Sequence, residues 1–167
     1  MILPRDCKLE GLRDSKLISA KKRQRIALEI KTQAIAWSVA HVPAAEIDRT
    51  NIAAATEMAM YEAIHGLDVM PDLLLIDAVA VDIPILQISI IHGDAVSGSI
   101  AAASIVAKVT RDALMEELDA QYPGYGIGRH AGYGTAAHLK ALEALGPTPL
   151  HRMSFAPLRD LNKSFRP

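Results

Sequence analysis

Two acidic residues close two short apolar runs in the middle of the chain, and this arrangement constrains the fold more than any other feature. Asp77 ends the run LLLID, and Asp94 follows the run LQISIIH after a single glycine. Each run has the length and composition of a short buried strand, and a helix rich in small residues is expected to start near Ala95. In an α/β fold, strand ends and helix starts meet at one edge of the sheet. Residues 73–112 therefore predict an α/β protein that brings two carboxylates to one point.

Paired carboxylates at such an edge favour a hard divalent cation. Mg²⁺ and Mn²⁺ bind oxygen ligands, keep several waters and use substrate phosphates to complete their coordination. Either Asp77 or Asp94 alone would more often be a strand-end cap or a turn former than a ligand. The pair, with the residues that flank it, predicts a site for Mn²⁺ or Mg²⁺.

Sequence blocks on both sides of this pair resemble the signature blocks of bacterial ribonuclease HII. In chain order they are GLRDSKLISAKKR, IDRTNIAAATEMAM, IIHGDAVSGSIAAASIVAKVTRD, YPGYGIGRHAGYGT and GPTPLHRMSFAPL. The resemblance runs from Ile2 to about Leu158. It implies an α/β, ribonuclease H-like mixed sheet flanked by helices. It also implies an endoribonuclease that uses divalent metal ions to hydrolyse the RNA strand of RNA–DNA hybrids and to cut at ribonucleotides embedded in DNA.

The resemblance assigns roles to individual residues. Asp77 and Asp94 fall on two of the family's four metal-binding carboxylates, and two-metal hydrolysis would make them catalytic. Tyr133 falls on the tyrosine of the family's GYG block, which packs at the deoxyribose that follows the ribonucleotide. Ser15 and Lys16 belong to a D-S-K block, so both are candidate substrate contacts.

The chain also departs from the family's pattern. It contains no G-x-D-E-A-G-R-G segment, which in the family supplies the other two carboxylates and the loop that reads the ribose. Its first residues, MILPRDC, resemble the end of the family's second strand. We therefore expect a chain that is incomplete at its N-terminus, lacks the central first strand and is impaired in catalysis. Such a chain is expected to be insoluble, swapped into an oligomer or only partly folded. Two smaller departures are Ala131, where the family commonly has Lys, and the Ala-Val that follows Asp77 in place of Gly-Asn.

Charge is distributed unevenly along the chain, although the net charge is only −1. Residues 1–31 hold nine Lys or Arg against four acids, residues 32–150 hold five against fourteen, and residues 151–167 hold four against one. Basic ends around an acidic centre suit a protein that grips phosphates at its rim and holds cations in its middle. A solvated helix face explains the basic residues at 21–25 equally well.

Further polar residues have competing interpretations. Lys108 and Arg111 are three residues apart on the predicted helix, so both could face one phosphate or simply water. Asp112 is interpreted as the partner of a neighbouring base, and the small residues of SIAAAS as positions for close helix packing. The histidines at 92, 130, 138 and 151 match no zinc spacing.

Periodicity and turn residues divide the chain into alternating elements of one domain, residues 1–167, in which residues from about 150 to 167 form a C-terminal tail. The predicted elements are a helix capped by Ser19, a strand at 35–40, a helix at 50–66, strands at Leu73–Asp77 and 86–92, a helix at 95–120, a loop at 122–134 and a helix from Thr135 to Gly146.

Composition excludes several classes of protein. No apolar stretch reaches the ~18 residues that a membrane span needs, and no secretion signal is recognised. A single cysteine, Cys7, suits a reducing cytoplasm. No obligate protein partner is indicated. Two alternatives stay open: a non-catalytic nucleic-acid-binding fragment, and a nucleotide-binding α/β module that uses residues 93–99 as a phosphate nest.

Overall fold

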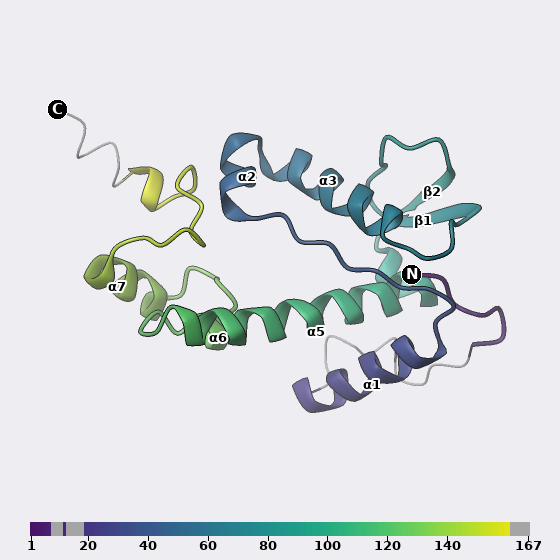
Figure 1. Ribbon diagram of the computed structural model, residues 1–167, viewed down its shortest axis with the longest axis horizontal. Helices are drawn as coiled ribbons and strands as arrows, with labels where there is room; N and C mark the ends of the chain where they lie inside the picture. The colour runs from purple at the N-terminus through teal and green to yellow at the C-terminus, as the bar shows by residue number, and fades with distance from the viewer. Residues whose placement is uncertain (8–11, 13–18, 161–167) are drawn as a thin grey trace. The chain divides into compact units, whose positions relative to one another are not determined.

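The structure, a computed structural model, describes residues 1–7, 12 and 19–160 (Figure 1). Helices alternate with one small parallel sheet, which confirms the predicted α/β class. In chain order the elements are α1 (Ala20–Gln33), α2 (Ala44–Arg49), α3 (Ile52–His65), β1 (Leu73–Asp77), β2 (Leu86–Ile90), α4 (Gly93–Val96), α5 (Gly98–Gln121), α6 (Ile127–His130) and α7 (Ala136–Leu145).

The chain is divided into two compact units. The first comprises Met1–Ala40 and Met60–Ala113, and the second comprises His41–Ala59 and Leu114–Pro167. Helices α3 and α5 contribute residues to both units. The single domain expected over residues 1–167 stays a prediction.

The sheet of the first unit consists of β1 and β2 in parallel register. Leu73 lies opposite Leu86, and Asp77 lies opposite Ile90. One face is covered, because Leu74 and Ile76 pack with Val81 and with partly buried residues of α3 and of the β1–β2 connection. The other face carries exposed apolar side chains, namely Leu73, Leu75, Leu86 and Ile88. β2 ends two residues before the predicted bound, because His92 has left-handed backbone angles (φ 56°) that turn the chain into α4.

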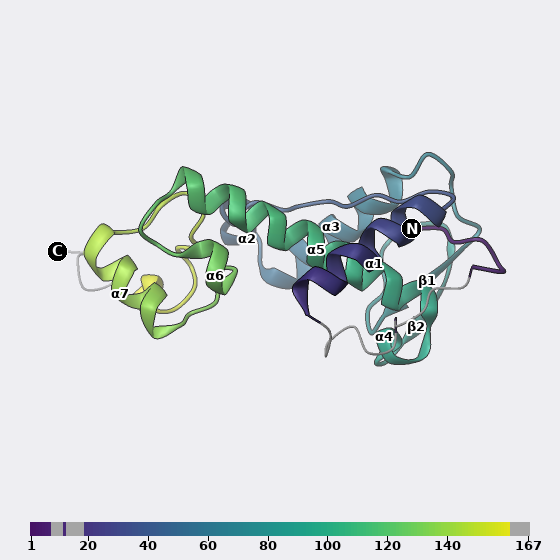
Figure 2. The ribbon, with the colours of Figure 1, turned by 90° about the horizontal axis from the view of Figure 1, so that it is seen from below.

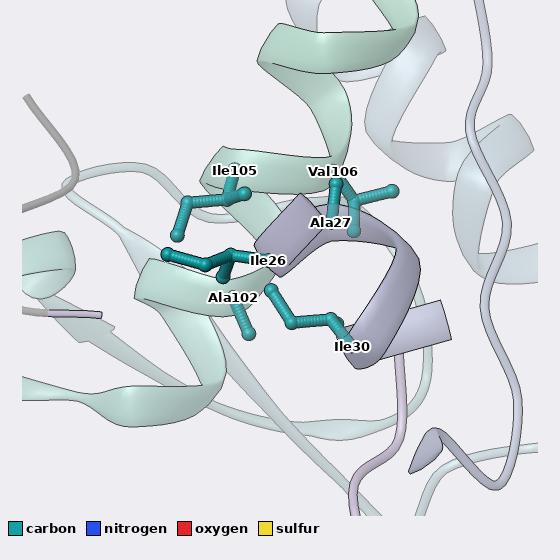
Figure 3. Packing of buried hydrophobic residues seen from close by; sticks show 6 residues of the cluster. All are labelled: Ile26, Ala27, Ile30, Ala102, Ile105 and Val106. Atoms are coloured by element: carbon teal, nitrogen blue, oxygen red, sulfur yellow. The ribbon is translucent and has the colours of Figure 1, made fainter. Parts of the chain in front are cut away.

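A second cluster of the first unit joins α1 to the N-terminal half of α5 (Figure 3). Ser19 begins α1 as predicted, since its hydroxyl accepts a hydrogen bond from the Lys22 amide at 3.3 Å. The buried side chains are Ile26, Ala27 and Ile30 of α1 and Ala102, Ile105 and Val106 of α5. Ala102 is fully buried in this contact, which confirms close packing in the SIAAAS segment, although it packs there on α1 and not on a sheet as expected.

Two predicted elements differ from the structure. Among the described residues, segment 35–40 forms only an isolated antiparallel bridge between Ala36 and Ile2, because a strand needs a partner along its whole length and Ile2 supplies one position. The helix predicted at 95–120 is two helices. Ser97 adopts an extended conformation between α4 and α5, and its hydroxyl caps the amide of Ile100 at 3.4 Å.

The second unit is built around α7 and the segment that follows it (Figure 2). Thr135 caps α7 as predicted, and Gly146 ends the helix with φ 78°. Its core consists of Tyr125, Ile127, Leu142 and Leu158. The predicted loop at 122–134 contains the single turn α6, and the described part of the predicted tail packs through Leu158.

The predicted helix at 50–66 is α3 alone. Asn51 caps it by accepting a hydrogen bond from the Ala54 amide at 3.0 Å, and α2 precedes it as a separate helix.

No helix among the described residues is both long and apolar enough to cross a membrane.

Candidate metal and nucleic-acid site

Asp77 is the last residue of β1, and its carboxylate points to the start of α4. Its Oδ1 accepts a hydrogen bond from the Gly93 amide at 2.9 Å. Helix α4 also contacts β1, so this hydrogen bond is part of a packed junction between the two elements. The strand end and the helix start therefore meet at one point, as the sequence predicts.

Gly93 makes this junction possible because it has no side chain. A Cβ at this position would lie 2.5 Å from Cδ1 of Ile100 and 3.5 Å from Oδ1 of Asp77. Gly93 is buried, so a larger residue would push its amide away from Asp77. A glycine therefore lets the backbone approach the carboxylate without displacing the Ile100 side chain.

Asp94 follows Gly93 directly and lies in the first turn of α4. It is half-buried, whereas Asp77 is exposed. The Asp77–Gly93 hydrogen bond thus holds the backbone next to Asp94 against the Asp77 carboxylate. Carboxylate oxygens are the ligands that Mg²⁺ and Mn²⁺ prefer, so the donor chemistry of this pair suits the expected ions.

Lys108 and Arg111 lie on α5, on either side of Val109, which packs against the cluster shared with α1. Nζ of Lys108 is 2.5 Å from Oδ1 of Asp112, an i,i+4 ion pair between partly exposed side chains. This pair confirms that Asp112 is the partner of a neighbouring base. Arg111 is exposed on the same helix. A phosphate would have to compete with Asp112 for the Lys108 ammonium group.

Tyr133 lies in the second unit, in the loop between α6 and α7, and 70% of its surface is exposed. Its amide donates to the carbonyl of His130 at 2.9 Å, and its own carbonyl accepts from the Thr135 amide at 2.8 Å. The backbone of Tyr133 is therefore fixed while its ring faces solvent. Asp77 and Asp94 belong to the first unit. Ser15 and Lys16 lie outside the described residues.

Sequence reasoning missed two polar arrangements of the second unit. The carboxylate of Asp48 binds the backbone of Met153 and Ser154 more than 100 residues later. His138 is the one buried polar residue recorded in the described chain, and it lies against His130 and His151. The sequence signal was present in the IDRTN, AAHL and LHRMS segments, but nothing in a linear sequence shows that they meet.

The described residues contain no group of three or more His, Cys, Asp or Glu side chains that could hold a metal ion. The histidines were not expected to form a zinc site. Asp77 and Asp94 are two residues, so their role as metal ligands stays a prediction, as do the substrate contacts assigned to Tyr133, Lys108, Arg111, Ser15 and Lys16.

Comparisons with known proteins agree on one family. The family model described as Ribonuclease HII matches residues 5–158. A curated relative named Ribonuclease HII, from Shouchella clausii, is 57% identical over 94% of this chain and 61% of its own length. Another of that name, from Enterococcus faecalis, is 55% identical over 96% of this chain and 63% of its own length. The chain thus spans less than two thirds of these relatives.

Solved structures show the same fold at low sequence identity. The ribonuclease H2 from Pyrococcus horikoshii OT3 superposes with a TM-score of 0.78 at 22% identity, over 93% of this chain and 82% of its own. The crystal structure of Bst-RNase HIII in complex with Mn²⁺ gives a TM-score of 0.63 at 19% identity, over 94% of this chain and 59% of its own. The ribonuclease H-like fold class expected from the sequence is therefore confirmed.

Proposed function

Because the chain belongs to the ribonuclease HII family, we propose that it carries part of the active site of an endoribonuclease acting on RNA–DNA hybrids and on DNA with embedded ribonucleotides. The observation that supports this function best is the 2.9 Å hydrogen bond from the Gly93 amide to Asp77. It joins the strand that ends in Asp77 to the helix that begins beside Asp94. Two carboxylates carried on this one junction would supply ligands for metal-dependent phosphodiester hydrolysis.

Asp77 and Asp94 would hold Mn²⁺ or Mg²⁺ in this proposal. The Gly93 amide orients the Asp77 carboxylate by occupying Oδ1. Divalent ions held there would lower the pKa of a water molecule and offset the negative charge at the scissile phosphate. Two-metal sites of this kind use about four carboxylates, as the family resemblance implies, and this pair supplies two. We therefore expect hydrolysis of the hybrid by the 167-residue chain itself to lie near background.

Tyr133 is proposed to contact the nucleic acid through its exposed ring. An aromatic ring in a glycine-rich loop can stack on a sugar or a base while its hydroxyl reaches a polar group. Lys108 and Arg111 are proposed phosphate contacts from α5, and Ser15 and Lys16 are proposed from the D-S-K block alone. The 2′-hydroxyl is the group that would distinguish RNA from DNA.

We propose that the protein acts in the cytoplasm, because Cys7 is its single cysteine and the family resemblance favours that compartment.

The geometry argues against a nucleotide-binding module at residues 93–99. The Gly93 amide, which a phosphate nest would use, already donates to the Asp77 carboxylate. Helix α4 is a single turn of four residues, and Asp94 lies in it. Two carboxylates at the start of this short helix would repel a phosphate unless a cation lay between them.

Hydrolysis of a 5′-labelled RNA strand paired with DNA tests the proposal in two proteins. One is this chain, and the other is the longer Shouchella clausii relative with Asn at the positions that align with Asp77 and Asp94. Each Asn should abolish Mn²⁺- or Mg²⁺-dependent cleavage by the relative and leave hybrid binding largely intact, because Asn keeps the shape but removes the charge.

The matched control is Asn at the position that aligns with Asp72, an exposed acid just before β1. That control should cleave at the unmutated rate. Cleavage near the unmutated rate by either of the other two variants would remove that aspartate from the metal site. An ATP-binding arm on this chain, measured by filter binding against the hybrid, would reveal a nucleotide-binding module instead.

A further inference from the structure

Three histidine rings gather beneath the loop that carries Tyr133. His138 lies on α7 and is only 6% exposed, His130 ends α6, and His151 follows α7. The His130 and His138 rings are stacked with centroids 4.4 Å apart, and the His138 and His151 centroids are 5.3 Å apart. We name His130, His138 and His151 the histidine cluster. All three belong to the second unit.

The backbone around His151 determines which of its nitrogens carries the proton. The Thr148 amide donates to Nδ1 of His151 at 3.0 Å, and the Thr148 hydroxyl oxygen lies 2.8 Å from the same nitrogen, so we assign Nδ1 as an acceptor. The proton of the neutral ring therefore lies on Nε2, which is 3.1 Å from Nε2 of His138. A hydrogen bond needs one donor and one acceptor, so Nε2 of His138 accepts from His151.

His138 is then protonated on its other nitrogen, and the structure places a matching acceptor there. Nδ1 of His138 lies 3.0 Å from the carbonyl oxygen of Tyr133, which can only accept. The direction deduced from Thr148 at one end thus agrees with the direction that Tyr133 requires at the other. One continuous chain of hydrogen bonds runs from Thr148 through His151 and His138 to Tyr133.

The same reasoning assigns the tautomer of His130. The Gly132 amide donates to Nδ1 of His130 at 3.3 Å, which leaves Nε2 to donate to the Tyr125 carbonyl at 3.0 Å. The ring contacts and hydrogen bonds of the histidine cluster therefore commit all six ring nitrogens. A metal ion would have to displace one of these partners.

A proton added to either ring of the His138–His151 pair would break the chain. On His138 it would occupy Nε2 and face the Nε2–H of His151, and on His151 it would occupy Nδ1 and face the Thr148 amide. The titratable groups recorded against the pair are His130 from α6 and the Tyr125 ring, 5.4 Å from His151. Burial, with His138 acting in the same direction, lowers the pKa of His151.

We propose that His138 is a positioning residue for Tyr133, and that the neutral His151–His138 pair fixes the Tyr133 backbone so that its ring is presented to the nucleic acid. This role of His138 rests on the proposed contact of Tyr133 with the nucleic acid. The Tyr133 ring is exposed, so its position depends on the backbone rather than on packing of the ring. His138 supplies the side-chain hydrogen bond that ties this backbone to α7.

Nitrogen-15 NMR of the histidine rings in the whole chain tests the pair without any substrate. At pH 7.5 we expect neutral His138 with its proton on Nδ1 and neutral His151 with its proton on Nε2. Lowering the pH until His151 is protonated should, over the same pH range, speed amide exchange at Tyr133 and Thr135. The opposite tautomers, or protonation of His151 with no change at these amides, would overturn the proposal.

Two variants separate positioning from bulk packing. His138→Phe keeps a ring but loses the hydrogen bonds to His151 and to the Tyr133 carbonyl. Because the Tyr133 backbone loses one of these bonds, amide exchange at Tyr133 and Thr135 should rise roughly threefold to tenfold. His138→Asn retains an N–H near the position of Nδ1 and should restore most of the protection. Equal exchange in both variants and the unmutated chain would contradict a positioning role.

Binding to DNA with one embedded ribonucleotide distinguishes this inference from the function it rests on. His138→Phe should weaken binding to this DNA, and His138→Asn should bind nearly as tightly as the unmutated chain. Tyr133→Ala should bind weakly whichever residue stands at position 138. If Tyr133→Ala binds as tightly as the unmutated chain, the assigned role of Tyr133 fails and the proposal with it, even when the tautomers are those expected. If Tyr133→Ala binds weakly but His138→Phe binds as tightly as the unmutated chain, only the positioning role of His138 fails.

Discussion

The carboxylate of Asp48 ties α2 to a segment more than 100 residues later in the chain. Oδ2 accepts from the Met153 amide at 2.6 Å, and Oδ1 accepts from the amide and the hydroxyl of Ser154 at 3.1 and 2.5 Å. These hydrogen bonds, that of the Ser154 hydroxyl foremost, lower the pKa of Asp48. A single side chain therefore connects two parts of the second unit that are remote in sequence.

Asp48→Asn should destabilise the chain by about 1 to 2 kcal/mol at pH 7, less than a buried charged network because solvent screens this carboxylate. A lowered carboxyl pKa stabilises the folded state above the unfolded value of about 3.9 and loses that effect as the pH falls through the folded value. The stability difference between Asp48→Asn and the unmutated chain should therefore shrink between pH 7 and pH 2.5. Urea unfolding at both values measures it.

Glu143→Gln is the control for Asp48→Asn, because Glu143 is an exposed carboxylate of the same unit. It should change the unfolding free energy by less than about 0.5 kcal/mol. A loss in Asp48→Asn no larger than this, or one that does not depend on pH, would show that the Asp48 contacts do not stabilise the fold.

Tyr133→Ala should weaken binding to DNA with one embedded ribonucleotide roughly tenfold, the loss that one stacked base predicts. The melting temperature should change little, because the ring is 70% exposed and packs on little else. Fluorescence anisotropy and thermal unfolding measure the two effects. Tyr61→Ala, a partly exposed tyrosine on α3, is the control and should leave binding unchanged. A large fall in melting temperature with intact binding would give Tyr133 a structural role.

At the scale of elements, the junction between β1 and α4 depends on the small size of Gly93. Gly93→Ala would set a Cβ 2.5 Å from Cδ1 of Ile100, a buried side chain. The strain should lower stability by about 1 to 3 kcal/mol and move the Gly93 amide away from Asp77. Metal affinity should fall with it, as calorimetric titration with Mn²⁺ would show.

Gly134→Ala is the matched control for this junction, because a Cβ there meets nothing within 4 Å. It should leave both stability and Mn²⁺ affinity unchanged. If Gly93→Ala behaves like Gly134→Ala in both measurements, the close approach of the backbone to Asp77 is not what organises the site.

The exposed face of the sheet predicts self-association. Leu86 is 72% exposed and Ile88 is 48% exposed on adjacent positions of the same face. Exposed apolar strands readily associate with other chains. Leu86→Lys should therefore reduce concentration-dependent association in sedimentation velocity, whereas Leu28→Lys, at a 67% exposed position of α1, should not. Equal association in both variants would exclude this face as the contact.

The sequence predicted the elements whose causes are local and missed those whose causes are remote. Ser19, Thr135 and the LLLID run act within a few residues, so α1, α7 and β1 begin where they were expected. The alternation at 35–40 resembles a strand, but a strand exists only with a partner, and pairing is not visible in the alternation itself. The break at Ser97 was missed because a serine, although favoured at helix caps, is also tolerated inside a helix.

For the candidate site, the spacing of acids after apolar runs was sufficient to find Asp77 and Asp94. It could not reveal that the Gly93 amide donates to the Asp77 carboxylate, because that depends on how the end of β1 packs against the start of α4. The spacings of the histidines match no zinc motif, so the sequence assigns them no role. The three rings of the histidine cluster meet only because α6, α7 and the segment after α7 pack around one core.

At the scale of the whole molecule, the central claim is that this chain carries a divalent-metal site at Asp77 and Asp94 on a ribonuclease H-like fold. The acidic middle of the sequence, with fourteen acids against five bases over residues 32–150, favours cations there. Because the claim concerns where the ion binds, the most direct test locates the ion itself and needs no catalytic turnover.

That measurement is paramagnetic broadening of backbone amide signals by substoichiometric Mn²⁺ in the 167-residue chain. We expect broadening centred on Asp77, Gly93 and Asp94, reversed by excess Mg²⁺ and lost in both Asp77→Asn and Asp94→Asn. Broadening centred instead on His138 and His151, or broadening at Gly93 that survives both substitutions, would contradict it.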